Sequence, residues 1–170
     1  MALRIVLMTI KILSAMGDNM IRNVKMKIRE VNENDLVGLL KLYEQLHNNP
    51  MPEIDKQLQG IWNNILNDKN HHIIVGIIDE RIISSCVITV VPNLTHGQRP
   101  YALIENVITD EKYRNKGCAT SVLDYAKEIA DKDNCYKIML MTGSKQESTL
   151  EFYEQAGYNK NDKTAFIRWL

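Results

Sequence analysis

The segment Tyr113-Arg-Asn-Lys-Gly-Cys-Ala-Thr120 holds the residue types and spacing that most clearly indicate chemistry. It joins a strand-like run to a helix-like run, so we expect a helix N-terminus with free backbone N–H groups. The small residues Gly117 and Ala119 would let an anion approach these groups, while Arg114 and Lys116 add positive charge. The pattern predicts a pyrophosphate-binding loop that consists of Arg114, Asn115, Lys116, Gly117, Cys118, Ala119 and Thr120.

An Arg-x-x-Gly-x-Ala pattern is weak evidence by itself, because a glycine-started helix with solvated charges has the same letters. The loop lacks the Gly-x-x-x-x-Gly-Lys-Ser/Thr motif of a nucleotide P-loop and the Gly-x-Gly-x-x-Gly motif of a dinucleotide fold. Coenzyme A is therefore the leading candidate among phosphate-bearing ligands. Cys118 has no histidine nearby in the sequence, so we interpret it as a small helix-start residue and not as a nucleophile.

The elements around this loop predict one mixed domain over residues 26–170. Helices are expected after Asn32, over residues 54–66, from Gly117 onward, and between a Ser144-x-x-Glu147 capping box and a closing glycine at position 157. The second and third strands should form an antiparallel hairpin. This order is typical of an α/β (α+β) fold. Strands are expected at residues 26–31, 72–78, 81–91, 101–109, 136–141 and 164–169.

Composition narrows the classes of partner. The chain of 170 residues carries 21 basic and 21 acidic residues, so no global charge favours nucleic acid or an anionic membrane. Residues 1–25 contain no apolar run long enough to span a membrane, and we interpret them as a flexible N-terminal extension. Cys86, Cys118 and Cys135 form neither a metal-binding cluster nor a disulfide pattern, which favours a reducing, cytoplasmic location and no metal.

Two motifs together resemble the GNAT superfamily of N-acetyltransferases. The run from Ile104 to Ala119 is similar to the acetyl-CoA motif of this family, and Phe152-Tyr-Glu-Gln-Ala-Gly-Tyr158 is similar to its Phe-Tyr-x-x-x-Gly-Phe/Tyr segment. The stretch from Glu105 to Tyr158 also resembles glucosamine-6-phosphate N-acetyltransferases. The resemblance implies a mixed, mostly antiparallel sheet flanked by helices, with acetyl-CoA as co-substrate.

The resemblance also implies roles for individual residues. A primary amine would attack the thioester directly in a ternary complex, with Glu105 as general base and Tyr153 as proton donor to the leaving thiolate. The alternatives are an ion-paired or surface role for Glu105 and a packing role for Tyr153. The backbone of Val107, Ile108 and Thr109 would splay from the neighbouring strand and pair with pantetheine.

Departures from the family pattern lie beside these positions. Thr109-Asp110-Glu111 stands where many members have Val-x-Pro, and Gln146 or Thr149 stands where an asparagine often contacts the cofactor. The implied function is transfer of an acetyl group to a primary amine of a small molecule. A protein or peptide N-acetyltransferase and a non-catalytic acyl-CoA-binding module are the alternatives, and a homodimer is left open.

Overall fold

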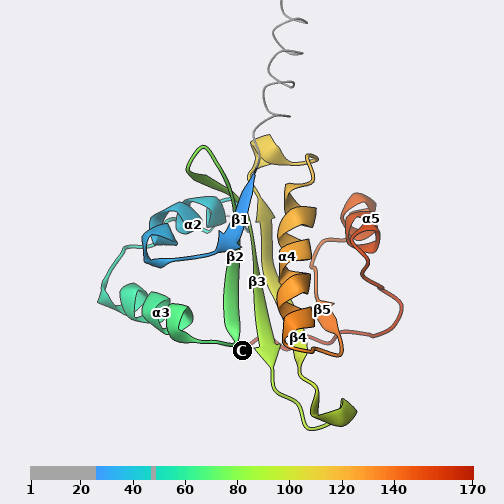
Figure 1. The fold of residues 1–170 in the computed structure, drawn as a ribbon. Helices are drawn as coiled ribbons and strands as arrows, with labels where there is room; N and C mark the ends of the chain where they lie inside the picture. Colours follow the sequence, from blue (N-terminus) through green and yellow to red (C-terminus); the bar gives the residue numbers. More distant parts are fainter. Residues whose placement is uncertain (1–25, 47–48) are drawn as a thin grey trace, which may run out of the picture.

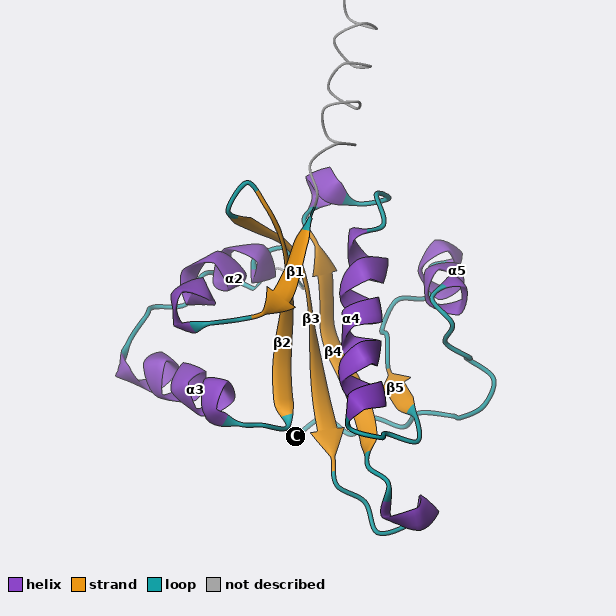
Figure 2. Cartoon of the chain, viewed as in Figure 1, coloured by secondary structure: helices purple, strands orange, loops and turns teal. Residues whose placement is uncertain are grey.

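The structure, a computed structural model, describes residues 26–46 and 49–170 (Figures 1 and 2). Its strands are β1 (Lys27–Glu30), β2 (His71–Ile78), β3 (Arg81–Val91), β4 (Tyr101–Thr109) and β5 (Ile138–Leu140). Its α-helices are α2 (Leu36–Tyr43), α3 (Lys56–Asn67), α4 (Cys118–Lys132) and α5 (Glu147–Gln155). Short 3-10 helices are η1 (Glu33–Asp35), η2 (His96–Gln98) and η3 (Glu111–Tyr113). The predicted extension, residues 1–25, lies outside the described residues.

The strands of the described residues form one sheet in the order β1-β2-β3-β4-β5. Neighbouring strands are antiparallel from β1 to β4, whereas β5 runs parallel to β4. This mixed, mostly antiparallel sheet with flanking helices confirms the predicted fold class. The predicted hairpin is also present, and its two turn residues Asp79 and Glu80 have φ values of 47° and 59°. Positive φ at both positions gives the turn the twist that a two-residue hairpin needs.

Helices cover both faces of the sheet (Figure 1). On the face covered by α4, Ile74 and Ile104 of the sheet pack with Val122 of the helix, and each is at most 1% exposed. On the face covered by α2 and α3, Val75 packs with Trp62. Because both faces are buried, β2 is apolar along most of its length and does not alternate.

The strand predicted at residues 164–169 is wrong. The structure has no strand there, and Phe166 and Trp169 are 92% and 88% exposed. Aromatic and β-branched residues favour strands mainly through packing against neighbouring strands. In the described residues β5 pairs only with β4 and has three residues, fewer than the predicted 136–141, so residues 164–169 have no strand partner.

The predicted Ser144–Glu147 capping box is also wrong, although the helix after it exists. Gln146 is the N-cap of α5 and makes no side-chain capping bond. The Ser144 hydroxyl donates instead to Thr149 Oγ1 at 3.1 Å and accepts from the Gln146 N–H at 3.3 Å. Local hydroxyl bonds of this kind compete with helix capping. Gly157, with a φ of 90°, follows the end of α5 as predicted.

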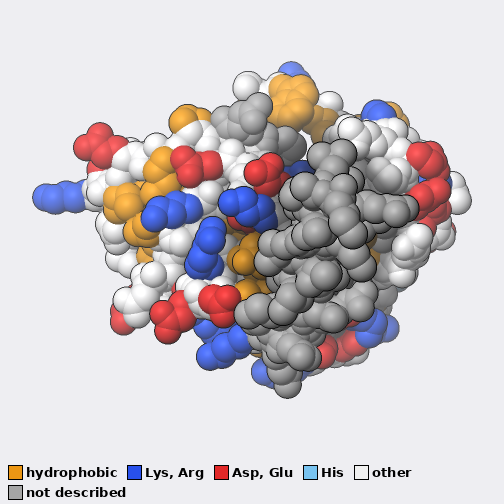
Figure 3. Space-filling view, turned by 90° about the horizontal axis from the view of Figure 1, so that it is seen from above, with side chains coloured by type: hydrophobic (Ala, Val, Ile, Leu, Met, Phe, Trp, Pro, Cys, Tyr) orange, Lys and Arg blue, Asp and Glu red, His pale blue; other side chains and the backbone are white. Residues whose placement is uncertain are grey.

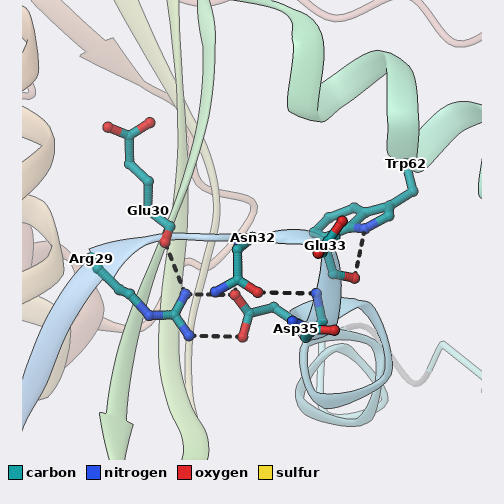
Figure 4. Close-up of polar contacts among 7 residues, drawn as sticks. Arg29, Glu30, Asn32, Glu33, Asp35 and Trp62 are labelled. Atoms are coloured by element: carbon teal, nitrogen blue, oxygen red, sulfur yellow. Dashed lines mark hydrogen bonds and ion pairs between the residues drawn. The ribbon is translucent and has the colours of Figure 1, made fainter.

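A polar network ties β1 to the start of α2 (Figure 4). Asn32 caps η1, as predicted, by accepting from the Asn34 N–H at 3.0 Å, while the Asn32 N–H donates to Asp35 Oδ2 at 2.7 Å. Arg29 Nη2 donates to Asp35 Oδ1 at 2.9 Å. Burial by itself would raise the pKa of Asp35, but the bonds from Arg29 and Asn32 outweigh it and hold this pKa below its ordinary value.

We predict that Asp35→Ala lowers the free energy of unfolding by about 2 kcal/mol at neutral pH, because Arg29 and the Asn32 N–H lose their acceptor. Urea unfolding measures this. The folded-state pKa of Asp35 is depressed, so its contribution is present above about pH 4 and is lost as pH falls through the folded pKa. Glu33→Ala, which removes an exposed carboxylate from the same turn, is the control and should change stability little.

Candidate active site

β4 carries a one-residue bulge at the centre of the predicted site. Val87 of β3 pairs with Glu105, and Ser85 pairs with Ile108, so β4 has one residue more than β3 between these pairs. Asn106 in the bulge has a φ of 52°, a left-handed conformation that asparagine adopts more readily than most residues. A bulge bends its strand and re-aims the side chains beside it.

β4 loses its second neighbour near the same point. β5 pairs with β4 only opposite Ala102 to Ile104, and no other strand of the described residues lies beside this edge of β4. The predicted cofactor-binding residues Val107, Ile108 and Thr109 therefore lie beyond the end of the pairing with β5. Backbone N–H and C=O groups along such an open edge can bind an extended ligand, which then takes the place of an additional strand.

The predicted phosphate loop is a tight turn that leads into α4. Asn115 and Gly117 have φ values of 59° and 79°. Gly117 is the N-cap of α4 and makes no side-chain capping bond. The Ser121 N–H donates to the Gly117 carbonyl at 3.0 Å, which leaves the N–H groups of Cys118, Ala119 and Thr120 without a partner inside the helix. Free N–H donors and the positive end of a helix dipole are the groups that favour binding of an anion.

The cations of the loop are held beside this helix start. Arg114 Nε donates to the Thr109 carbonyl at 3.2 Å, which ties the guanidinium to the end of β4. Lys116 Nζ donates to the Lys112 carbonyl at 3.0 Å and lies 5.5 Å from the centre of the Tyr113 ring. Lys116 is exposed, so its ammonium group can exchange this hydrogen bond for one to an anion. The loop thus combines backbone donors with two positive side chains.

Cys118 packs at the start of α4. Its side chain is 7% exposed and lies in a cluster with Ile78 and Ile83. Burial raises the pKa of the Cys118 thiol, so it stays protonated at neutral pH. This environment supports the packing role that we assigned to Cys118.

Tyr153 lies half-buried on α5 against the α4 side of the sheet. Its ring packs against Phe152, with centroids 4.9 Å apart, and against Tyr158, with centroids 6.1 Å apart. Burial is the main cause that raises the pKa of the Tyr153 phenol, and Cys86 and then Glu105 contribute smaller effects in the same direction. The phenol is therefore protonated throughout the neutral range and is able to donate a proton.

Glu105 is exposed and comes from the bulge of β4. Its pairing partner Val87 packs in the cluster beneath α2 and α3, and directly opposed residues share a face of the sheet. Glu105 therefore lies on the α2 face, whereas Tyr153 lies on the α4 face. The charge of Glu105 makes a small contribution to the raised pKa of Tyr153, after burial and Cys86.

Two buried hydroxyl groups in this region were missed by the sequence analysis. Tyr43 Oη of α2 and Ser85 Oγ of β3 have no hydrogen-bond partner among the described residues. Burial raises the pKa of Tyr43 to about 12. Tyr43 occupied a helical apolar position and Ser85 a strand position, so both patterns indicated core packing only. The pairing of Ser85 with Ile108 places its hydroxyl beside the bulge, and no signal in the sequence marks that proximity.

One face of the molecule, seen from above the view of Figure 1, carries charges of both signs. In the parts of Figure 3 that are coloured, Lys and Arg side chains lie beside Asp and Glu side chains. Within residues 26–46 and 49–170, no three His, Cys, Asp or Glu side chains are grouped as a metal ion would require. Across the same part of the chain, every helix is too short or too polar to cross a membrane.

The sequence profile described as the Acetyltransferase (GNAT) family matches residues 33–158. The chain belongs to this family. It is 27% identical over 148 residues to a glucosamine 6-phosphate N-acetyltransferase of Trypanosoma brucei brucei, covering 82% of this chain and 93% of that protein. The family match and this relative define the protein as an N-acetyltransferase.

Solved structures agree with the fold. A putative acetyltransferase from Agrobacterium tumefaciens superposes with a TM-score of 0.77 at 35% identity, covering 84% of this chain and 99% of that one. The structure of AAC(6')-Iy in complex with the bisubstrate analogue CoA-S-monomethyl-acetylneamine superposes with a TM-score of 0.70 at 16% identity, covering 86% and 99% of the two chains. The open edge of β4 and the start of α4 thus lie in a fold shared with acetyltransferases.

We predict that Gly117→Asp weakens acetyl-CoA binding about a hundredfold or more, because it places a carboxylate at the helix start where the pyrophosphate would lie. Gly117→Asn is the matched control, since asparagine has the same shape, no charge and a tolerance for the φ of 79°. Nothing lies within 4 Å of a Cβ at this position, so neither side chain clashes. Calorimetry with acetyl-CoA compares the two. Equal affinity of the two variants for acetyl-CoA would indicate that the pyrophosphate binds elsewhere.

Proposed function

We propose that this N-acetyltransferase uses acetyl-CoA as co-substrate and acetylates a primary amine of a small molecule by direct attack in a ternary complex. The observation that carries the proposal is the junction of two features at one end of β4. There the strand edge has lost its pairing with β5, and the uncapped start of α4 follows eight residues after the strand ends at Thr109. Acetyl-CoA offers an extended pantetheine arm for the first feature and a pyrophosphate for the second.

The cofactor would lie along the chain in a defined direction. The backbone of Val107, Ile108 and Thr109 binds pantetheine, and the loop from Arg114 to Thr120 holds the pyrophosphate. This direction places the thioester near the bulge at Asn106. Backbone groups at the bulge would then polarise the thioester carbonyl.

The two candidate side chains, Glu105 and Tyr153, suit the proton transfers. An alkyl amine is mostly protonated at neutral pH, so Glu105 accepts the proton that must leave before attack. The neutral amine nitrogen bonds to the thioester carbon, the carbon–sulfur bond then breaks, and the thiolate takes its proton from Tyr153. The proton that the nitrogen loses as it becomes the amide restores the Tyr153 phenol, so that the protons balance. The raised pKa of Tyr153 keeps that proton in place until the thiolate forms.

The small-molecule acceptor is favoured by the relatives, one named for glucosamine 6-phosphate and one bound to an acetylneamine conjugate of CoA. A protein or peptide acceptor is the second candidate. The test is a screen of the purified protein with acetyl-CoA against amino sugars and their phosphates, aminoglycosides, polyamines and peptides, with release of CoA as the readout. Turnover confined to peptides would favour the second candidate. Binding of acetyl-CoA without turnover on any amine would favour a non-catalytic acyl-CoA-binding module.

The cellular location and the oligomeric state of the enzyme are also proposed. Cys86, Cys118 and Cys135 are all free, which supports a reducing, cytoplasmic location that cell fractionation would test. The exposed apolar residues Phe166 and Trp169 offer a surface for a homodimer. Light scattering separates a dimer from a monomer of 19.6 kDa.

We predict that Tyr153→Phe lowers kcat about a hundredfold and changes acetyl-CoA affinity little, because the ring keeps its packing and only the proton donor is lost. Steady-state kinetics with an accepted amine measure both parameters. Tyr101→Phe, which removes a hydroxyl at the opposite end of β4, is the control and should leave kcat unchanged. If the Tyr153→Phe enzyme has the kcat of wild type, Tyr153 is not the proton donor and has only a packing role.

We predict that Glu105→Gln lowers kcat/KM about a hundredfold at neutral pH, and that the deficit shrinks as pH rises toward the pKa of the acceptor amine. Above that pKa the amine is already neutral and needs no base. A pH profile of both enzymes measures the effect. A deficit that is the same at every pH would contradict a base and would indicate that Glu105 only positions the acceptor.

A further inference from the structure

Gln45 joins two parts of the chain that are far apart in the sequence. It follows directly on the last turn of α2, and its side chain reaches the turn that leaves β4. The Gln45 carboxamide oxygen accepts from the Glu111 N–H at 3.0 Å, and its amide nitrogen donates to Asp110 Oδ2 at 3.3 Å. The oxygen and the nitrogen of one carboxamide thus bind Glu111 of η3 and Asp110, the N-cap of η3.

Asp110 is the residue on which the turn into the phosphate loop depends. It is 8% exposed, and Asp110 Oδ1 accepts from the Lys112 N–H at 2.9 Å. Its backbone N–H donates to the Ile83 carbonyl at 2.8 Å, and its carbonyl accepts from the Tyr113 N–H at 2.8 Å. Gln45 binds the second carboxylate oxygen, so every polar group of Asp110 has a partner.

The backbone of Gln45 is anchored to α2, and α2 is packed on the sheet. The Gln45 N–H donates to the Leu42 carbonyl at 3.1 Å, and Leu39 and Leu42 are only 2% and 3% exposed. Leu39 packs in the cluster that fixes α2 to the sheet. Gln45 therefore connects η3 to a helix on the face of the sheet opposite α4 (Figure 1).

We propose that Gln45 is a positioning residue, which holds η3 so that the loop from Arg114 to Gly117 presents its donors to the cofactor pyrophosphate. The inference rests on the proposed function, because it requires that this loop bind acetyl-CoA. Without the Gln45 side chain the segment from Asp110 to Gly117 keeps its hydrogen bonds to β3 and β4 but loses those to the end of α2. The loop then samples conformations in which the N–H groups at the start of α4 and the Arg114 side chain no longer converge on one anion.

The first test is the affinity of CoA for the whole protein, measured by calorimetry. Gln45→Ala should weaken CoA binding about fivefold to tenfold, as expected for the loss of two partly exposed hydrogen bonds. Gln45→Glu keeps an acceptor for the Glu111 N–H but sets a carboxylate against Asp110, so it should weaken binding further. Gln59→Ala, at an exposed glutamine of α3, is the matched control and should bind as wild type.

The second test separates positioning from a general loss of structure. In steady-state assays Gln45→Ala should raise KM for acetyl-CoA by the same factor and leave kcat within about twofold. With S-acetylpantetheine, which lacks the pyrophosphate, kcat/KM of the variant should equal that of wild type. A loop-positioning role predicts a defect with acetyl-CoA, which carries the pyrophosphate, and none with S-acetylpantetheine. Partial unfolding would lower activity with both substrates.

The outcomes are distinct from those of the proposed function. Wild-type affinity for CoA in both Gln45 variants overturns the positioning role and leaves the proposed function standing. An equal loss with acetyl-CoA and S-acetylpantetheine also overturns it, since the defect would then be general. Failure of the wild-type protein itself to bind CoA overturns the proposed function, and this inference with it.

Discussion

The backbone of β4 must find hydrogen-bond partners on two sides, and on one side it finds them over only part of its length. β3 follows β4 to its end, while β5 pairs with it only from Ala102 to Ile104. Inside a sheet, unpaired N–H and C=O groups are costly and invite a ligand that supplies the missing strand. This shortage of partners leaves the edge of β4 open beyond Ile104, and the bulge at Asn106 lies just beyond the point where the pairing with β5 ends.

The connection after β4 places the second half of the site at the end of the same edge. Asp110 ends the strand, η3 turns the chain, and Gly117 begins α4. α4 can lie close to the sheet because small and branched side chains such as Val122 and Ala126 face it. The proposed anion site and the open strand edge thus share one short stretch of chain, and a ligand with an extended arm and a phosphate would occupy both at once.

The sheet also separates the two groups assigned to proton transfer. Glu105 shares the face of Val87 beneath α2, whereas Tyr153 belongs to the cluster on the α4 face. A continuous sheet would isolate them. In the proposed reaction the missing pairing beyond Ile104 would let both groups reach a ligand bound along this edge, and burial keeps the phenol of Tyr153 protonated. In that reaction the acceptor amine and the thioester would enter from different directions.

The sequence by itself determined the elements whose patterns are local. The hairpin through Asp79, the cap at Asn32 and the glycine start of α4 were predicted because turn, capping and periodicity rules depend on neighbouring residues. The roles of Glu105 and Tyr153 came from resemblance to a family and not from such rules.

The tertiary structure alone decided which features meet. The strand predicted at residues 164–169 does not form, because a strand requires a partner and none lies beside it in the described residues. The contact of Gln45 with Asp110, 65 residues away, has no local pattern either. The same is true of the buried hydroxyls of Tyr43 and Ser85. Pairing register and the docking of α2 on the sheet depend on contacts between distant parts of the chain, and hydrophobic periodicity records only which face is buried, not what covers it.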